Sequence, residues 1–132
     1  MKPKIVKATS SKEFLTPERC FVFENWGLIS SGDKAVSIAR ARVVPGVTTK
    51  EHHLEGTQEI YLIVKGRGRV QIGGLEPTDV VEGDAVIIPE GTSQRITNIG
   101  KTDLVFIASA RPRSRKTVTA MKRQKCSGKI PS

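Results

Sequence analysis

Residues 46–54 read Gly-Val-Thr-Thr-Lys-Glu-His-His-Leu, and Glu59 and Gly66 follow at fixed distances. The spacing is G-x5-H-x-L-x4-E-x6-G. A second stretch, residues 83–98, reads GDAVIIPEGTSQRITN, with the spacing G-x5-P-x-G-x2-Q-x3-N. Glycine adopts the positive φ of tight turns, and proline ends strands because it has no N–H to donate. Both stretches therefore predict short strands that turn at fixed positions.

Together the two stretches resemble the two motifs of the cupin superfamily, G-x5-H-x-H-x3,4-E-x6-G and G-x5-P-x-G-x2-H-x3-N. The matching turn and end positions are Gly46, Gly66, Gly83, Pro89, Gly91 and Asn98. The resemblance covers about residues 35–110. It implies an all-β, single-domain fold, the double-stranded β-helix of RmlC-like jelly-roll barrels.

The four metal-ligand positions of these motifs are only half retained. His52 stands at the first ligand histidine and Glu59 at the carboxylate, whereas Leu54 replaces the second histidine and Gln94 the third. The resemblance thus implies the fold strongly but leaves an incomplete ligand set.

The residues outside the motifs favour the same fold class. Runs rich in Val and Ile recur between clusters of Gly, Pro, Asp and Asn, at residues 35–44, 59–64, 68–72, 85–88, 94–97 and 104–108. Runs this short, without long helical periodicity, are typical of an antiparallel sandwich or barrel.

Alternation along the strands predicts a polar group inside the barrel. Because every second side chain shares a face, an inward His52 places Leu54 inward and His53 outward. Glu59 and Tyr61 share a face of the next run, and Gln94 begins a later one. We therefore expect His52, Glu59, Tyr61 and Gln94 to form a ligand-binding site, with Leu54, Ile63 and Ile96 as its apolar lining.

Metal binding at this site stays open at the level of sequence. His52, Glu59 and Gln94 supply one imidazole, one carboxylate and one amide, a weaker set than three imidazoles and a carboxylate. A one-residue bulge would bring His53 inward as an alternative ligand. We expect a divalent ion such as Zn, Ni, Mn or Fe to be weakly held or absent.

Length and charge define three segments. Residues 1–110 carry 14 basic and 13 acidic residues, a net charge of +1, whereas residues 111–132 carry eight basic residues and no acidic one. We predict an arm at 1–34 that packs on the barrel or a dimer partner, the barrel at 35–110, and a basic extension at 111–132. The extension has no aromatic residue for base stacking, so nucleic-acid binding is not expected.

The ends and the cysteines carry further expectations. The start, Met-Lys-Pro-Lys-Ile-Val-Lys, lacks the apolar stretch of a signal peptide, and no run is long enough to span a bilayer. We expect a cytoplasmic protein without a membrane partner, in which Cys20 and Cys126 are thiols. The resemblance also implies a homodimer.

Three functions remain compatible with the sequence. The first is a small-molecule-binding cupin whose lumenal pocket takes a polar or anionic metabolite. The second is a divalent-metal-dependent enzyme of the dioxygenase or isomerase type. The third is a polyanion-binding protein that uses the basic extension. A shared fold does not choose among them, so the sequence does not decide whether the chain is an enzyme.

Overall fold

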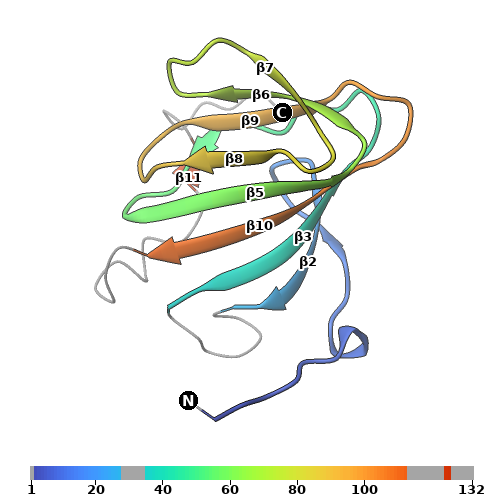
Figure 1. The fold of residues 1–132 in the computed structure, drawn as a ribbon, viewed down its shortest axis with the longest axis vertical. Coiled ribbons are helices and arrows are strands. Elements are labelled where there is room, and N and C mark those ends of the chain that lie inside the picture. Colours follow the sequence, from blue (N-terminus) through green and yellow to red (C-terminus); the bar gives the residue numbers. More distant parts are fainter. Residues whose placement is uncertain (1, 28–34, 113–123, 126–132) are drawn as a thin grey trace.

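A computed structural model describes residues 2–27, 35–112 and 124–125 of the chain, which fold into two antiparallel sheets (Figure 1). The six-stranded sheet has the order β1-β2-β3-β10-β5-β8, and the five-stranded sheet the order β11-β4-β9-β6-β7. The prediction of an all-β jelly-roll barrel is confirmed. Within the described residues the single helical element is a short 3-10 turn, η1, so no helix is long and apolar enough to cross a membrane.

The strands are short, as the spacing of turn residues predicts. The six-stranded sheet contains β1 (Phe14–Leu15), β2 (Phe21–Trp26), β3 (Ser37–Val43), β10 (Leu104–Pro112), β5 (Thr57–Lys65) and β8 (Ala85–Ile88). The five-stranded sheet contains β11 (Gln124–Lys125), β4 (His52–His53), β9 (Gln94–Asn98), β6 (Arg67–Ile72) and β7 (Thr78–Val81). The turn η1 covers Ala8–Ser10. All six predicted runs are strands. A strand at His52 was expected through the alternation applied there, whereas β1, β2, β7 and β11 were not predicted.

Strand β5 shows how alternation positions the interior. Thr57, Glu59, Tyr61 and Ile63 are buried, while the residues between them are exposed. The strand lies between β10 and β8 in its sheet, so its backbone is paired on both sides. The inward residues of β5 therefore face the middle of the barrel, where side chains of the other sheet meet them.

Gly66 makes the tight turn between β5 and β6. Its φ is +91°, and a Cβ added there would lie 2.7 Å from the carbonyl oxygen of Asp103. A side chain at this position would be strained twice, by the backbone conformation and by the clash. This accounts for the glycine at the end of the first motif.

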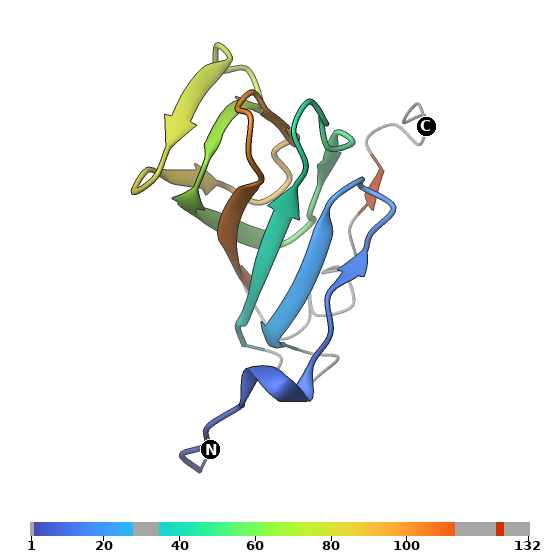
Figure 2. The ribbon, with the colours of Figure 1, turned by 90° about the vertical axis from the view of Figure 1, so that its right-hand side faces the viewer.

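The N-terminal arm contributes strands to the barrel. β2 pairs antiparallel with β3, with Val22 opposite Ala41, and β1 pairs with β2 at the sheet edge. Figure 2 shows β2 beside β3, with the 3-10 turn and the N-terminus extending away below the barrel. The predicted boundary at residue 34 therefore does not coincide with the edge of the sheet. The three-part division of the chain stays a prediction.

The other predicted boundary, at residue 110, falls within β10. This strand runs on to Pro112, opposite Thr57 of β5. Beyond it, Gln124 and Lys125 form β11, which pairs with His53 and His52 of β4. The backbone of the basic extension thus adds an edge strand to the five-stranded sheet. Its other residues lie outside the described part of the chain.

Candidate functional site

The four predicted site residues are all buried. His52 comes from β4, Glu59 and Tyr61 from β5, and Gln94 from β9, and their exposed fractions lie between 1% and 5%. Leu54, Ile63 and Ile96 are buried as well, as the alternation predicts. His52 lies opposite Gln94 in the register of β4 and β9.

The side-chain amide of Gln94 connects Glu59 to Tyr61. Gln94 Nε2 donates a hydrogen bond of 2.8 Å to Glu59 Oε1, and the Tyr61 hydroxyl donates a hydrogen bond to Gln94 Oε1. A carboxamide carries both donors and an acceptor, so it joins an acceptor on one side to a donor on the other. Gln94, at the position of the third motif histidine, therefore ties three buried polar groups into one network.

This network does not fit a firmly held transition metal. Gln94 Oε1 and Glu59 Oε1 both accept hydrogen bonds within it. Within residues 2–27 and 35–112, no three His, Cys, Asp or Glu side chains are grouped so that they could hold a metal ion. A transition-metal site in a protein usually has three or four firm protein donors. Metal binding by His52, Glu59 and Gln94 therefore stays a prediction that would require rearrangement.

The ring of His52 is oriented by the main chain. Its Nδ1 lies 2.8 Å from the carbonyl oxygen of Lys50, which can only accept, so Nδ1 carries a proton. In the neutral ring the lone pair is then on Nε2. His53, the next residue of β4, does not line the internal cavity. Its Nε2 lies 3.8 Å from Glu55 Oε1.

A cavity of about 30 Å³ lies inside the barrel next to His52 and Tyr61. Its other polar lining residues are Glu18, Cys20 and Thr49, and the remaining six are apolar or alanine. Such a volume accommodates about two water molecules. Glu59 and Gln94 are not on its wall, so of the four predicted residues two line the cavity and two lie behind it.

Glu18 and Cys20 were missed from the sequence. Both lie in the turn that leads into β2, where Arg19 has a positive φ, so strand alternation does not apply to them. No local pattern in the sequence identified them. Among the described residues Cys20 forms no disulfide, and its sulfur lies 3.4 Å from Thr16 Oγ1. Cys126 lies outside the described residues.

The turn at Thr16–Cys20 is joined to the segment that precedes His52. Arg19, which has a positive φ of 73°, donates from its guanidinium to the carbonyl oxygen of Thr48 at 3.2 Å. The Lys50 N–H donates to the carbonyl oxygen of Glu18 at 3.1 Å. Lys50 therefore contacts the arm through its N–H and His52 through its carbonyl oxygen.

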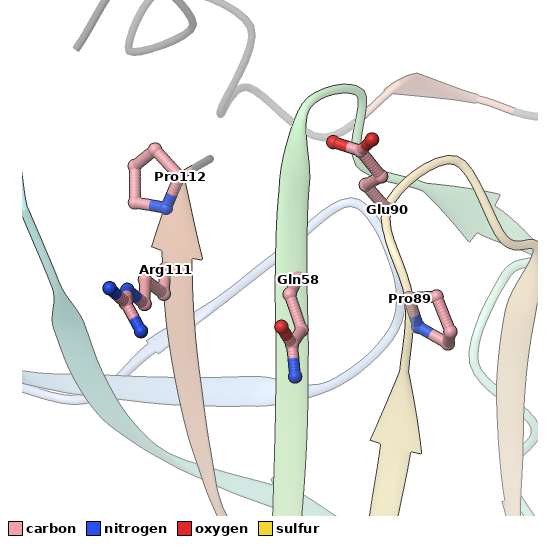
Figure 3. Close-up of a pocket in the computed structure, with 5 residues that line it drawn as sticks. All are labelled: Gln58, Pro89, Glu90, Arg111 and Pro112. Carbon is pink, nitrogen blue, oxygen red and sulfur yellow. The ribbon is translucent and has the colours of Figure 1, made fainter. Parts of the chain in front are cut away.

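A larger hollow of about 480 Å³ is lined by none of the four predicted site residues. Figure 3 shows Gln58 on β5 between Arg111 and Pro112 at the end of β10 and Pro89 and Glu90 after β8. Gln58 and Arg111 are exposed and are opposite each other in the register. This groove is more open than the internal cavity, so we place the candidate site in the barrel, where the buried polar groups converge.

Comparison with known proteins agrees with this architecture. The sequence pattern of the family described as the cupin domain matches residues 39–109, more than half of the chain. This chain belongs to the cupin family. The match spans β3 to most of β10, and therefore includes His52, Glu59, Tyr61 and Gln94.

Two curated cupin relatives match over 76 residues, 58% of this chain. An oxalate-binding protein of Thermotoga maritima is 37% identical, and the match spans 62% of its length. An uncharacterised protein of Methanocaldococcus jannaschii is 36% identical, over 60% of its length. The chain thus matches under two thirds of either relative.

One solved structure combines fold similarity with appreciable identity. It is described as a predicted oxalate decarboxylase of Thermotoga maritima, with a TM-score of 0.70 and 26% identity. The superposition covers 83% of this chain and 99% of that one. The similarity extends beyond the motif region.

Proposed function

We propose that this cupin binds a compact polar or anionic metabolite in its lumen, with a divalent metal weakly held or absent. The observation that carries the proposal is the hydrogen-bonded group Glu59–Gln94–Tyr61, of which Tyr61 lies on the cavity wall together with His52. A polar network buried this deeply is costly to keep unless its members are satisfied. In this chain the Gln94 amide satisfies both Glu59 and Tyr61.

The cavity restricts the size of the ligand. With room for about two waters, it takes a molecule of a few heavy atoms, unless side chains on its wall move. Oxalate, the ligand in the name of the Thermotoga maritima relative, has six heavy atoms and would enter only if side chains on the wall moved. We therefore propose small carboxylic acids as the ligand class, rather than sugars or nucleotides.

The charge of the lining indicates how an anion would be held. Within the described part of the chain the lining includes no lysine or arginine, and Glu18 adds a carboxylate. The imidazole of His52 is on this wall as well. The Tyr61 hydroxyl and the Thr49 hydroxyl are on the same wall and can donate hydrogen bonds.

Titration calorimetry with oxalate tests the proposal, comparing the wild type with His52→Gln and His53→Gln. We expect His52→Gln to weaken binding at least about tenfold, because the variant loses the imidazole on the cavity wall. His53→Gln should bind as the wild type does. Equal binding by His52→Gln would contradict the proposal, as would a failure of oxalate and of other small carboxylates to bind.

A second candidate is a divalent-metal-dependent enzyme of the dioxygenase or isomerase type. The observation that favours it is that both retained ligand positions, His52 and Glu59, are buried and belong to strands that face the lumen. A metal there would act as a Lewis acid toward a bound oxygen ligand. Elemental analysis of the purified protein separates the two candidates. We assign no reaction to the chain.

The remaining expectations concern location and partners. A homodimer and a cytoplasmic location stay predictions. Binding of a polyanion through residues 111–132 is the least favoured function, and most of that segment lies outside the described residues.

A further inference from the structure

The internal cavity has no room for a ligand of the proposed class unless part of its wall moves. Its volume is about 30 Å³, enough for about two waters. Eleven of the described residues line it, and eight of these belong to strands. The other three are Glu18, Cys20 and Thr49. The part of the wall that opens most easily therefore decides how a ligand enters.

The strands of the wall are held by backbone ladders on both sides. β3 lies between β2 and β10, β5 between β10 and β8, and β9 between β4 and β6. Thr49 is fixed as well, because its N–H donates to the carbonyl oxygen of Ile96 at 2.9 Å and its hydroxyl accepts from the Ile96 N–H at 3.0 Å. Displacing these parts would leave buried backbone groups without partners, which is costly.

Glu18 and Cys20 belong to the turn of the β1–β2 hairpin, residues 16–20, which we call the hairpin tip. Figure 2 shows this hairpin, in blue, at the edge of the six-stranded sheet. The tip is closed on itself, since the Thr16 N–H donates to the carbonyl oxygen of Cys20 at 2.8 Å and the Arg19 N–H to that of Thr16 at 3.1 Å. β1 and β2 share two register pairs. The tip is thus a compact unit on a short pair of strands.

Hydrogen bonds join the hairpin tip to the segment before His52. Arg19 Nη1 donates to the carbonyl oxygen of Thr48 at 3.2 Å, and the Lys50 N–H donates to that of Glu18 at 3.1 Å. Among the described residues Arg19 is the only non-glycine residue with a positive φ, +73°. Such a conformation is strained for arginine and persists where surrounding contacts hold it. Lifting the tip would therefore break these bonds and release strain, but it would open no strand ladder of the barrel.

We infer that the hairpin tip is the gate of the lumen: it lifts off residues 48–50 to admit the ligand and closes again over it. Closure places Glu18 and Cys20 in the cavity wall. It also re-forms the bond from the Lys50 N–H to the tip, and the carbonyl oxygen of Lys50 accepts from the His52 ring. The gate therefore couples ligand entry to the orientation of His52. The identity of the ligand rests on the function proposed above, whereas the gate is defined by contacts within the chain.

The thiol of Cys20 reports the position of the tip. The chain has two cysteines, so Cys126→Ser leaves Cys20 as the sole thiol. In that background its rate of reaction with dithiobis(nitrobenzoate) measures how often the tip opens. Arg19→Asn should raise this rate at least about fivefold, because asparagine tolerates a positive φ but lacks the guanidinium that binds Thr48. The matched control, Arg95→Asn on the outer side of β9, should stay within about twofold of the wild type.

Urea distinguishes opening of the tip from unfolding of the whole barrel. Lifting the tip exposes little surface, so the labelling rate should change little in dilute urea, whereas labelling through global unfolding rises steeply. An unchanged rate in Arg19→Asn, an equal increase in Arg95→Asn, or a steep urea dependence would overturn the gate. If Arg19→Asn fails to fold, Arg19→Gly takes its place, because glycine adopts a positive φ without strain.

Oxalate, used as the probe, separates the gate from the ligand proposal. At saturation, verified by calorimetry, it should slow the labelling of Cys20 at least about threefold, because a ligand bound under the closed tip holds the tip shut. If oxalate binds and leaves the labelling rate unchanged, the gate is overturned and the ligand proposal stands. If no small carboxylate binds while Arg19→Asn still reacts faster, the ligand proposal fails and the opening of the tip stands.

Discussion

Gln94 and Arg95 are neighbours on β9 and show how differently the two sides of one sheet use hydrogen bonds. Gln94 faces inward, is 1% exposed, and donates a hydrogen bond of 2.8 Å to Glu59. Arg95 faces outward, is exposed, and donates a hydrogen bond of 2.6 Å to Gln71. The shorter bond is the exposed one. Burial, not length, decides the contribution of each bond, because a buried group that loses its partner has no water to replace it.

Gln94→Leu is expected to have the largest effect on the stability of the fold. The substitution keeps most of the volume but removes the partner of the Glu59 carboxylate and of the Tyr61 hydroxyl. We expect the free energy of unfolding to fall by about 3 kcal/mol. Urea denaturation followed by circular dichroism measures it.

The matched variant is Arg95→Leu, on the outward side of the same strand. Its effect should stay within about 0.5 kcal/mol, as for most surface substitutions. Similar losses in the two variants would show that the distinction between the inner and outer bonds is wrong.

The second prediction replaces the inner hydrogen bonds by metal coordination. Elemental analysis should find far less than one equivalent of metal in the wild type. The double variant Leu54→His, Gln94→His has a ligand-type side chain at each of the four motif positions. Two of these are His52 and Glu59, and the other two are the introduced histidines.

Without metal this double variant should be less stable than the wild type, because the Gln94 bridge is lost. Zn²⁺ or Ni²⁺ at one hundred times its dissociation constant should then restore about 2.7 kcal/mol. Thermal unfolding with and without metal measures the shift. An unchanged melting temperature would mean that Leu54 and Gln94 do not share a site.

The smallest effect on stability is expected from the ion pair of Glu13 and Arg42, outside the barrel. The hydrogen bond from Arg42 lowers the pKa of the Glu13 carboxyl, and hydrogen bonds to Glu13 and Asp103 raise the pKa of Arg42. A carboxyl with a lowered pKa stabilises the fold above its unfolded pKa, and this contribution is lost as the pH falls through the folded value.

Glu13→Gln should therefore lower the urea midpoint slightly at pH 7, and the difference from the wild type should vanish toward pH 3. The effect should also shrink in high salt, since the pair is partly exposed. A difference that grows on acidification would contradict the assignment.

The sequence predicted the fold and the inward face of the site because glycine, proline and alternation act locally. Gly66 must turn whatever surrounds it, and Glu59 and Tyr61 share a face by the geometry of a strand. The bond from Gln94 to Glu59 joins residues 35 positions apart on different sheets. No local pattern specifies such a partner.

The contribution of the arm to the cavity was missed for a related reason. β2 shows no alternation of apolar and polar residues, because Phe21 and Phe23 on its outer side are covered by Arg42 and Arg40. Both faces of the strand therefore contain apolar residues, and the usual signal of a half-exposed strand is absent. Glu18 and Cys20 reach the cavity wall because β2 pairs with β3, and the sequence does not show this pairing.

The contacts of Lys50 connect His52 to β2, the strand that carries Trp26. Its N–H binds the turn that leads into β2, and its carbonyl oxygen holds the imidazole of His52. The sole tryptophan of the chain, Trp26, is at the far end of β2. Intrinsic fluorescence of Trp26 during ligand addition therefore tests, without a label, whether a displacement of the His52 ring reaches β2.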